Sequence, residues 1–311
     1  MPNFRPISNS WVARHPSPKG VIQFIGGTLV GSYPTWFYKS LLQDLFDQEY
    51  TIVALPFRFT FRHWSVALSL LKEQQAIRQE LCKISQSAGV SDQTIELYQD
   101  RTQYSWVGHS LGCKYIALLE LLIEWQRDPQ HLQKCINKLT ANPGSQIAQI
   151  KTGYRSLIES AAQADDQPVE TIIDQVSILL APVISDTKDA IPLPFLPQLI
   201  DGLGLGATPT QEETLKLIGD NSLFNLTGLI DFQADTCAGN RNSKDKNPKT
   251  VPALLSILQD NKPLTSKNVL AGGHGRPWSP KTKEIAEIVV AQIQTLRAKA
   301  EAKEVLTSSA P

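Results

Sequence analysis

The chain has 311 residues, of which 41% are hydrophobic, and this is enough to bury a full core. Lysine plus arginine equals aspartate plus glutamate at 30 each, so no net charge favours nucleic acid or an anionic membrane as a partner. No apolar run approaches the ~20 residues that a membrane-spanning helix needs, which leaves only peripheral contact with a membrane open. We therefore expect one domain over residues 1–311 that acts on a small molecule.

Strand-like and helix-like segments alternate along the first half of the chain. Residues 21–25 form a compact apolar run that ends at Gly26 and Gly27, which predicts a buried strand followed by a glycine loop. Helical spacing begins near Pro34, and a second strand and a second helix are expected at residues 51–55 and about 65–87. The next pair is a strand at residues 104–107 and a helix at 113–125 that is apolar on nearly all sides.

The alternation resumes in the second half. Strands are expected at residues 176–183, 224–232 and 269–271, followed by a terminal helix from about 281 to 304 and a disordered tail over 305–311. Because parallel strands need long crossovers, this order predicts an α/β fold with a mostly parallel central sheet and helices on both faces.

Two segments interrupt the alternation. Residues 127–175 are polar and helix-like with a break at residues 142–144, which predicts a helical insertion or lid. Residues 184–221 contain IPLPFLPQLIDGLGLG, which is too rich in proline and glycine for a regular core element and suits an apolar flap over a site.

The four cysteines show neither CxxC spacing nor the Cys/His spacing of a metal site; they are Cys82, Cys113, Cys135 and Cys237. Nothing at the N-terminus resembles the apolar segment of a secretory signal. We expect reduced thiols in a cytoplasmic protein without metal or cofactor, and we interpret Cys113 as a buried packing residue.

The pattern with the clearest chemistry is GxSxG at residues 108–112, which places Ser110 between a predicted strand and a predicted helix. A serine in such a turn projects its hydroxyl from an α/β sheet as a nucleophile. The glycines matter because a strained turn leaves no room for side chains two residues away on either side. The motif alone arises often by chance, so its partners decide its meaning.

A serine nucleophile needs a base, and histidine is the usual one because its unperturbed pKa is ~6.5. Of the five histidines, His274 stands in the loop AGGHG between the last predicted strand and the terminal helix, where the base of such a fold is expected. His109 is adjacent to the serine and is interpreted as part of the turn; the others are His15, His63 and His131.

An acid that orients the base should follow a strand between the serine and the histidine in sequence. Asp235 follows the predicted strand 224–232 and is the first choice. Asp231, inside that strand, and Asp186, after the strand 176–183, are the alternatives. Each also has an ordinary interpretation as a turn or capping residue.

Negative charge on the oxygen of a tetrahedral intermediate calls for two backbone N–H groups. We expect one from Leu111 and the other from the loop at Gly26 and Gly27. A phosphate-binding role for this loop is weaker, because neither GxGxxG nor GxxxxGK[ST] is present.

These residues resemble the α/β-hydrolase superfamily over residues 21–294. Two segments, FIGGTLVGSYPTWFYKSLL (24–42) and VGHSLGCKY (107–115), resemble more narrowly an uncharacterised α/β-hydrolase-like family of cyanobacteria and plastids. The resemblance implies Ser110 as nucleophile, Asp235 as orienting acid and His274 as base. The insertion at 127–175 departs from a minimal hydrolase.

The sequence thus predicts a serine hydrolase that acts on an ester or thioester with an apolar portion through an acyl-Ser110 intermediate. Two alternatives stay open: a non-catalytic hydrolase-fold protein that binds a partner or ligand, and an acyltransferase that uses the same three residues. The physiological substrate and the oligomeric state are not encoded in these patterns.

Overall fold

An eight-stranded sheet forms the centre of the part of the chain that the computed structural model describes, namely residues 2–28, 30–58, 60–162, 169–184, 208–220, 226–240, 249–260 and 265–308. Its strands are β1 (Arg5–Ile7), β2 (Ser10–Ala13), β3 (Val21–Ile25), β4 (Thr51–Ala54), β5 (Tyr104–His109), β6 (Val176–Leu180), β7 (Thr227–Phe232) and β8 (Thr265–Leu270). They lie in the order β1-β2-β4-β3-β5-β6-β7-β8.

The pairings from β4 across to β8 are all parallel, as the alternation predicted. Every residue of β3, β4, β5, β6 and β7 is buried, which fits strands covered on both faces. The antiparallel strands β1 and β2 extend one edge and were not predicted, because their short segments carry no apolar alternation.

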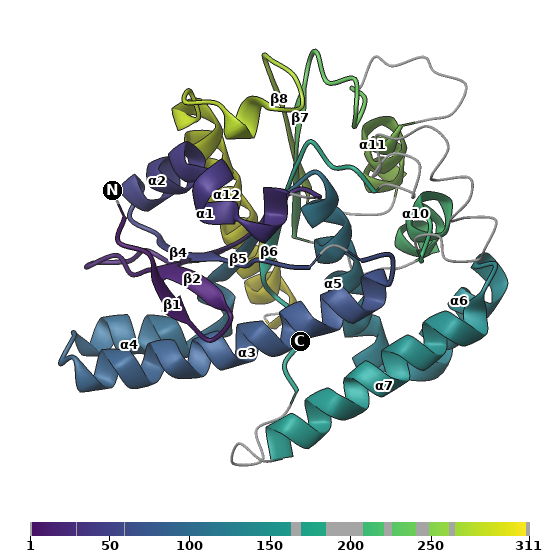
Figure 1. Ribbon diagram of the computed structural model, residues 1–311, viewed down its shortest axis with the longest axis horizontal. Helices are drawn as coiled ribbons and strands as arrows, with labels where there is room; N and C mark the ends of the chain where they lie inside the picture. The colour runs from purple at the N-terminus through teal and green to yellow at the C-terminus, as the bar shows by residue number, and fades with distance from the viewer. Residues whose placement is uncertain are drawn as a thin grey trace.

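Helices cover both faces of the sheet. The longer ones are α2 (Lys39–Asp47), α3 (His63–Ser87), α5 (Leu111–Arg127), α7 (Pro143–Ala162) and α12 (Lys283–Ser308). The shorter ones are α1 (Pro34–Phe37), α4 (Asp92–Gln99), α6 (Pro129–Leu139), α10 (Gln211–Asp220) and α11 (Thr250–Asp260). Figure 1 shows α2 and α12 on one side of the sheet and α3 and α5 on the other, and each pair packs into its own apolar cluster. The predicted α/β architecture is confirmed.

The expected insertion contains two helices among the described residues. α6 packs against α5, and α7 packs lengthwise against α3 (Figure 1). The break predicted at residues 142–144 coincides with the start of α7 at Pro143. Of the expected flap, residues 185–207 and 221 lie outside the described residues, while the stretch nearer its end forms helix α10.

The end of the chain differs from its prediction. α12 continues to Ser308, so residues 305–308 of the expected disordered tail are helical, and residues 309–311 lie outside the described residues. The residues just before this end, 298–304, are all alanine, glutamate or lysine, which are strong helix formers. No helix in the described part of the chain is both long enough and apolar enough to cross a membrane.

Helix α5 is the buried helix that the sequence predicted, and it carries an ionisable group into the core. Glu120 is 4% exposed, and its Oε1 accepts a hydrogen bond of 2.9 Å from the hydroxyl of Ser177. Burial raises the pKa of Glu120 to about 8 from its ordinary 4.5. The folded protein therefore holds a proton on Glu120 that the unfolded chain releases near pH 4.5, so this group favours folding less as the pH rises from 4.5 to 8.

Glu120→Gln keeps the acceptor for Ser177 and removes the titration. From pH 5 to pH 9 we expect the variant to gain about 4 kcal/mol in free energy of unfolding relative to the wild type, because each unit between the two pKa values is worth about 1.4 kcal/mol. Urea unfolding across this pH range measures the difference. Parallel pH profiles of the two proteins would contradict a buried, protonated Glu120.

Candidate active site

Ser110 occupies a sharp turn between β5, which ends at His109, and α5, which begins at Leu111. Its backbone has φ 55° and ψ −119°, a conformation that is costly for a residue with a side chain. Three backbone hydrogen bonds hold it: the N–H of Ser110 donates to Leu180, and its carbonyl oxygen accepts from Cys113 and Val183, each at 3.1 Å. The strain is thus maintained by the surrounding sheet, as a nucleophile turn requires.

The two motif glycines are required by close packing. A Cβ on Gly112 would lie 2.3 Å from the carbonyl oxygen of Ile25, and one on Gly108 would lie 2.9 Å from the backbone nitrogen of Cys113. Both contacts are far inside van der Waals distance. Glycine at position 112 therefore lets α5 begin directly against the end of β3.

His274 lies in the loop after β8 and contacts both Ser110 and Asp235. Its Nε2 is 2.9 Å from Ser110 Oγ, and its Nδ1 is 2.9 Å from Asp235 Oδ2. Because a carboxylate only accepts hydrogen bonds, Nδ1 carries the proton, which leaves Nε2 to accept from the serine hydroxyl. This is the tautomer that a base needs in order to remove the serine proton.

Asp235 is held rigidly after β7. Its Oδ1 accepts two backbone hydrogen bonds, from Cys237 at 2.8 Å and from Ala238 at 2.9 Å, which leaves Oδ2 directed at His274. Asp231 is buried within β7, and the described hydrogen bonds of the His274 ring do not include it. Asp186 lies outside the described residues. The structure therefore brings together Ser110, His274 and Asp235.

The remaining histidines lie apart from the serine hydroxyl. The ring of His15 packs on Phe46, that of His63 on Tyr115, and Nδ1 of His131 lies 3.0 Å from Glu124. His109 is fully buried, with one ring nitrogen 2.8 Å from the hydroxyl of Tyr38 and the other 3.0 Å from the carbonyl oxygen of His274. Its described hydrogen bonds therefore go to Tyr38 and to the backbone of His274, and not to the serine hydroxyl.

The glycine loop after β3 abuts the serine. A Cβ on Gly27 would lie 3.1 Å from Ser110 Cβ and 3.5 Å from its Oγ. The N–H of Gly27 donates to the hydroxyl of Tyr38 at 2.7 Å. The expected donor of this loop thus stands beside the nucleophile and already has an acceptor.

Cys113 is a packing residue in this structure. Its thiol is buried and donates to the carbonyl oxygen of Gly108 at 3.2 Å. Burial raises the pKa of this thiol, which disfavours the reactive thiolate. None of the four cysteines forms a disulfide.

Among the described residues, one group of side chains offers three ligand atoms for a metal ion within 4.8 Å of one another, namely Asp235, Cys237 and His274. Two of them already share the hydrogen bond that orients the base. A metal ion bound to these atoms would therefore compete with the hydrogen bond between Asp235 and His274 that turns the His274 ring toward Ser110.

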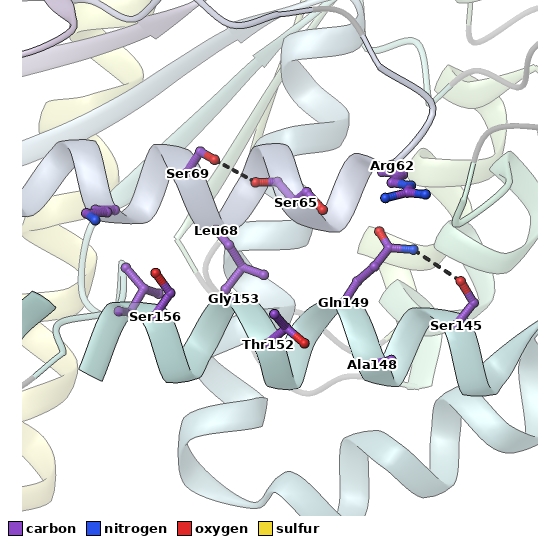
Figure 2. A pocket seen from close by; sticks show the side chains of 12 residues that line it. Arg62, Ser65, Leu68, Ser69, Ser145, Ala148, Gln149, Thr152, Gly153 and Ser156 are labelled. Carbon is purple, nitrogen blue, oxygen red and sulfur yellow. Dashed lines mark hydrogen bonds between the residues drawn. The ribbon is translucent and has the colours of Figure 1, made fainter. Parts of the chain in front are cut away.

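Exposed aromatic side chains follow two of the site loops. Tyr33 and Trp36 come after the glycine loop and are 66% and 74% exposed, and Trp278 is 42% exposed with its ring centroid 6.3 Å from that of His274. A cavity of about 510 Å³ lies elsewhere, between α3 and α7, and Figure 2 shows Ser65, Gln149 and other side chains that line it. None of the three site residues lines that cavity.

The sequence did not single out Tyr38 or Trp278, although both contact the site. Tyr38 sits in a segment whose aromatic and leucine residues all predict an apolar helix face, and its hydroxyl meets Gly27 and His109 only after the chain has folded. Trp278 lies four residues after His274, and that proximity was the available signal.

Comparison with solved structures identifies the fold. The chain resembles a hyperthermophilic esterase of the archaeon Pyrobaculum calidifontis, with a TM-score of 0.50 and 11% identity over 96% of this chain and 86% of that one. It equally resembles a protein of Lactobacillus plantarum WCFS1 that is provisionally named a carboxylesterase, with a TM-score of 0.50 and 14% identity over 96% and 98%. At such identities the likeness shows the fold, which is the α/β-hydrolase fold.

Comparison of the sequence gives the family. No curated protein matches the chain. One family model matches residues 3–164, a stretch that includes Gly27 and Ser110 and ends before Asp235 and His274. That match spans more than half of the 311 residues, so the chain belongs to the family described as "Protein of unknown function (DUF1350)".

Proposed function

We propose that this protein is a serine hydrolase that cleaves an ester or thioester through a covalent acyl-Ser110 intermediate. The observation that carries the proposal is the pair of 2.9 Å hydrogen bonds that join His274 to Ser110 Oγ and to Asp235. A binding protein without turnover needs neither this tautomer nor the strained serine, so the geometry argues against a non-catalytic role.

The chemistry follows from the positions of the protons. Ser110 Oγ attacks the carbonyl carbon of the substrate while its proton passes to His274 Nε2. The leaving alkoxide or thiolate takes that proton as the acyl–oxygen or acyl–sulfur bond breaks. Water then attacks the acyl-serine with His274 again as base, which releases the acid and regenerates the serine hydroxyl. Asp235 stabilises the imidazolium that forms in each half-reaction.

Backbone groups stabilise the oxyanion in this proposal. Leu111 is the first residue of α5, where a helix leaves its N–H groups without intrahelical acceptors. Gly26 and Gly27 form the other wall, and a Cβ at Gly27 would lie 3.5 Å from Ser110 Oγ. The Gly27 N–H already donates to the hydroxyl of Tyr38, so in this proposal the N–H of Leu111 binds the oxyanion while the bond to Tyr38 keeps the glycine loop in place beside it.

The exposed aromatic rings support a substrate with an apolar portion. Trp278 beside His274, and Trp36 after the glycine loop, offer apolar area that a hydrocarbon group can cover. We propose a small-molecule ester as the substrate and the cytoplasm as the location. The narrower membership in the hydrolase-like family of cyanobacteria and plastids, a single domain over residues 1–311 and a covering role for residues 127–175 and 184–221 belong to the same proposal.

A fluorophosphonate probe tests the proposal directly, because it phosphonylates only an activated serine. The folded wild type should be labelled, with the modified peptide containing Ser110, and Ser110→Ala should not be labelled. Ser279→Ala is a matched control, since this partly exposed serine lies five residues after His274 and outside its hydrogen bonds. An unlabelled wild type that is folded, or a labelled Ser110→Ala, would refute the nucleophile.

A further inference from the structure

A chain of hydrogen bonds joins three site loops beneath Ser110. The N–H of Gly27, after β3, lies 2.7 Å from the hydroxyl of Tyr38, and that hydroxyl lies 2.8 Å from His109 Nδ1 at the end of β5. His109 Nε2 lies 3.0 Å from the carbonyl oxygen of His274, after β8. Tyr38 and His109 are both fully buried.

The proton positions along this chain are fixed by what each atom can do. The carbonyl of His274 only accepts, so His109 Nε2 carries a proton. Burial and the nearby His274 ring lower the pKa of His109 well below its ordinary value, so the ring is neutral and its Nδ1 is a bare acceptor. The hydroxyl of Tyr38, whose pKa is raised by burial, therefore donates to Nδ1 and accepts from Gly27.

The surrounding rings leave this pair little freedom. The Tyr38 ring packs edge-on against Phe24 in β3 at a centroid distance of 4.6 Å. The His109 ring packs edge-on against Trp278 at 5.5 Å and stacks obliquely on His274 at 4.9 Å. Movement of either ring would leave buried polar atoms unpaired, which is costly.

We propose that Tyr38 and His109 are positioning residues that hold the glycine loop and the base loop at fixed places relative to Ser110. This inference rests on the proposed function. It gives His109, the residue before Ser110, a role other than proton transfer. The described hydrogen bonds of the two residues reach neither Ser110 Oγ nor the ring nitrogens of His274. They act through the backbone of Gly27 and of His274, so their loss should affect turnover more than substrate binding.

Tyr38→Phe removes one hydroxyl and keeps the ring. We expect kcat on p-nitrophenyl acetate to fall by about 10- to 100-fold while KM changes by less than about threefold, because misplacement of catalytic groups costs rate in this range. Tyr115→Phe is the matched control: its hydroxyl is also buried but has no hydrogen-bond partner among the described residues, and its loss should leave kcat unchanged. Thermal denaturation checks that both variants are folded. Equal kcat values in the two folded variants would overturn the proposal.

A double-variant cycle tests whether the two residues act as one chain. Because His109→Gln and Tyr38→Phe interrupt the same series of bonds, the combined variant should lose little more than the worse single variant. If the loss of kcat in the double variant equalled the product of the losses in the two single variants, Tyr38 and His109 would act independently, and their joint role would be refuted.

Nuclear magnetic resonance provides a readout that does not depend on turnover. Long-range nitrogen–proton spectra should show His109 as the neutral Nε2–H tautomer without titration between pH 6 and 9, and Tyr38→Phe should shift the Gly27 amide and the His274 Nδ1 proton. A titrating His109, or unmoved resonances in the variant, would refute the chain of bonds. If the wild type takes no fluorophosphonate label while these signals appear as expected, the hydrolase function fails and the buried arrangement stands.

Discussion

Replacing His274 by alanine is expected to lower kcat/KM on p-nitrophenyl esters by about 10⁴-fold or more while the protein stays folded. The imidazole is the group within hydrogen-bond distance of Ser110 Oγ that can take its proton, and the hydroxyl is a poor nucleophile without it. The fold should tolerate the loss of the ring, because its described hydrogen bonds go to Ser110 and Asp235 and none of them joins the strands of the sheet. Steady-state kinetics together with circular dichroism check both halves of the prediction.

His131→Ala is the control for loss of an imidazole elsewhere. This ring lies on α6, 3.0 Å from Glu124, and is well exposed. Turnover should stay at the wild-type level. If His274→Ala also retained turnover, His274 would have no part in the reaction.

Asp235→Asn is expected to lower kcat by about 10³- to 10⁴-fold. The asparagine oxygen can still accept from the backbone of Cys237 and Ala238, so the loop should keep its shape. The amide NH₂ would then face His274 Nδ1 and favour the tautomer that carries its proton on Nε2. In that form the ring cannot accept the serine proton, although every heavy atom is nearly in place.

A comparison of kcat for Asp235→Asn and Asp231→Asn tests which of the two aspartates orients His274. Circular dichroism checks that each variant is folded. The acid assignment requires the loss to follow Asp235. Were Asp231→Asn the inactive variant and Asp235→Asn the active one, the assignment would be reversed.

The arrangement of Ser110, Asp235 and His274 could be predicted because parallel strands place their carboxyl ends at one edge of the sheet. Once the strands were located, the residues that follow β5, β7 and β8 had to lie at the same edge of the sheet. The need for glycine at positions 108 and 112 could also be predicted, because a side chain at either position would collide with neighbouring backbone.

What the sequence did not reveal depends on tertiary contact. The start of β8 was missed because the residues TSKN are polar, and an edge strand tolerates such residues; the side chains of residues 266–268 are partly exposed. Tyr38 was hidden among the aromatic residues of its helix, and no local pattern shows that its hydroxyl would take the N–H of Gly27. Buried polar pairs of this kind are determined by the packed interior rather than by the period of a segment.

The position of β8 at the edge of the sheet affects how the site would respond to local unfolding. Ser110 is anchored between β5 and α5 in the deep interior, whereas His274 hangs from a strand with one described neighbour, β7. Edge strands open at lower free energy than central ones. Fraying of this edge would move the His274 ring away from Ser110 while the rest of the sheet stays assembled, so the proposed activity would be lost reversibly before the protein unfolds.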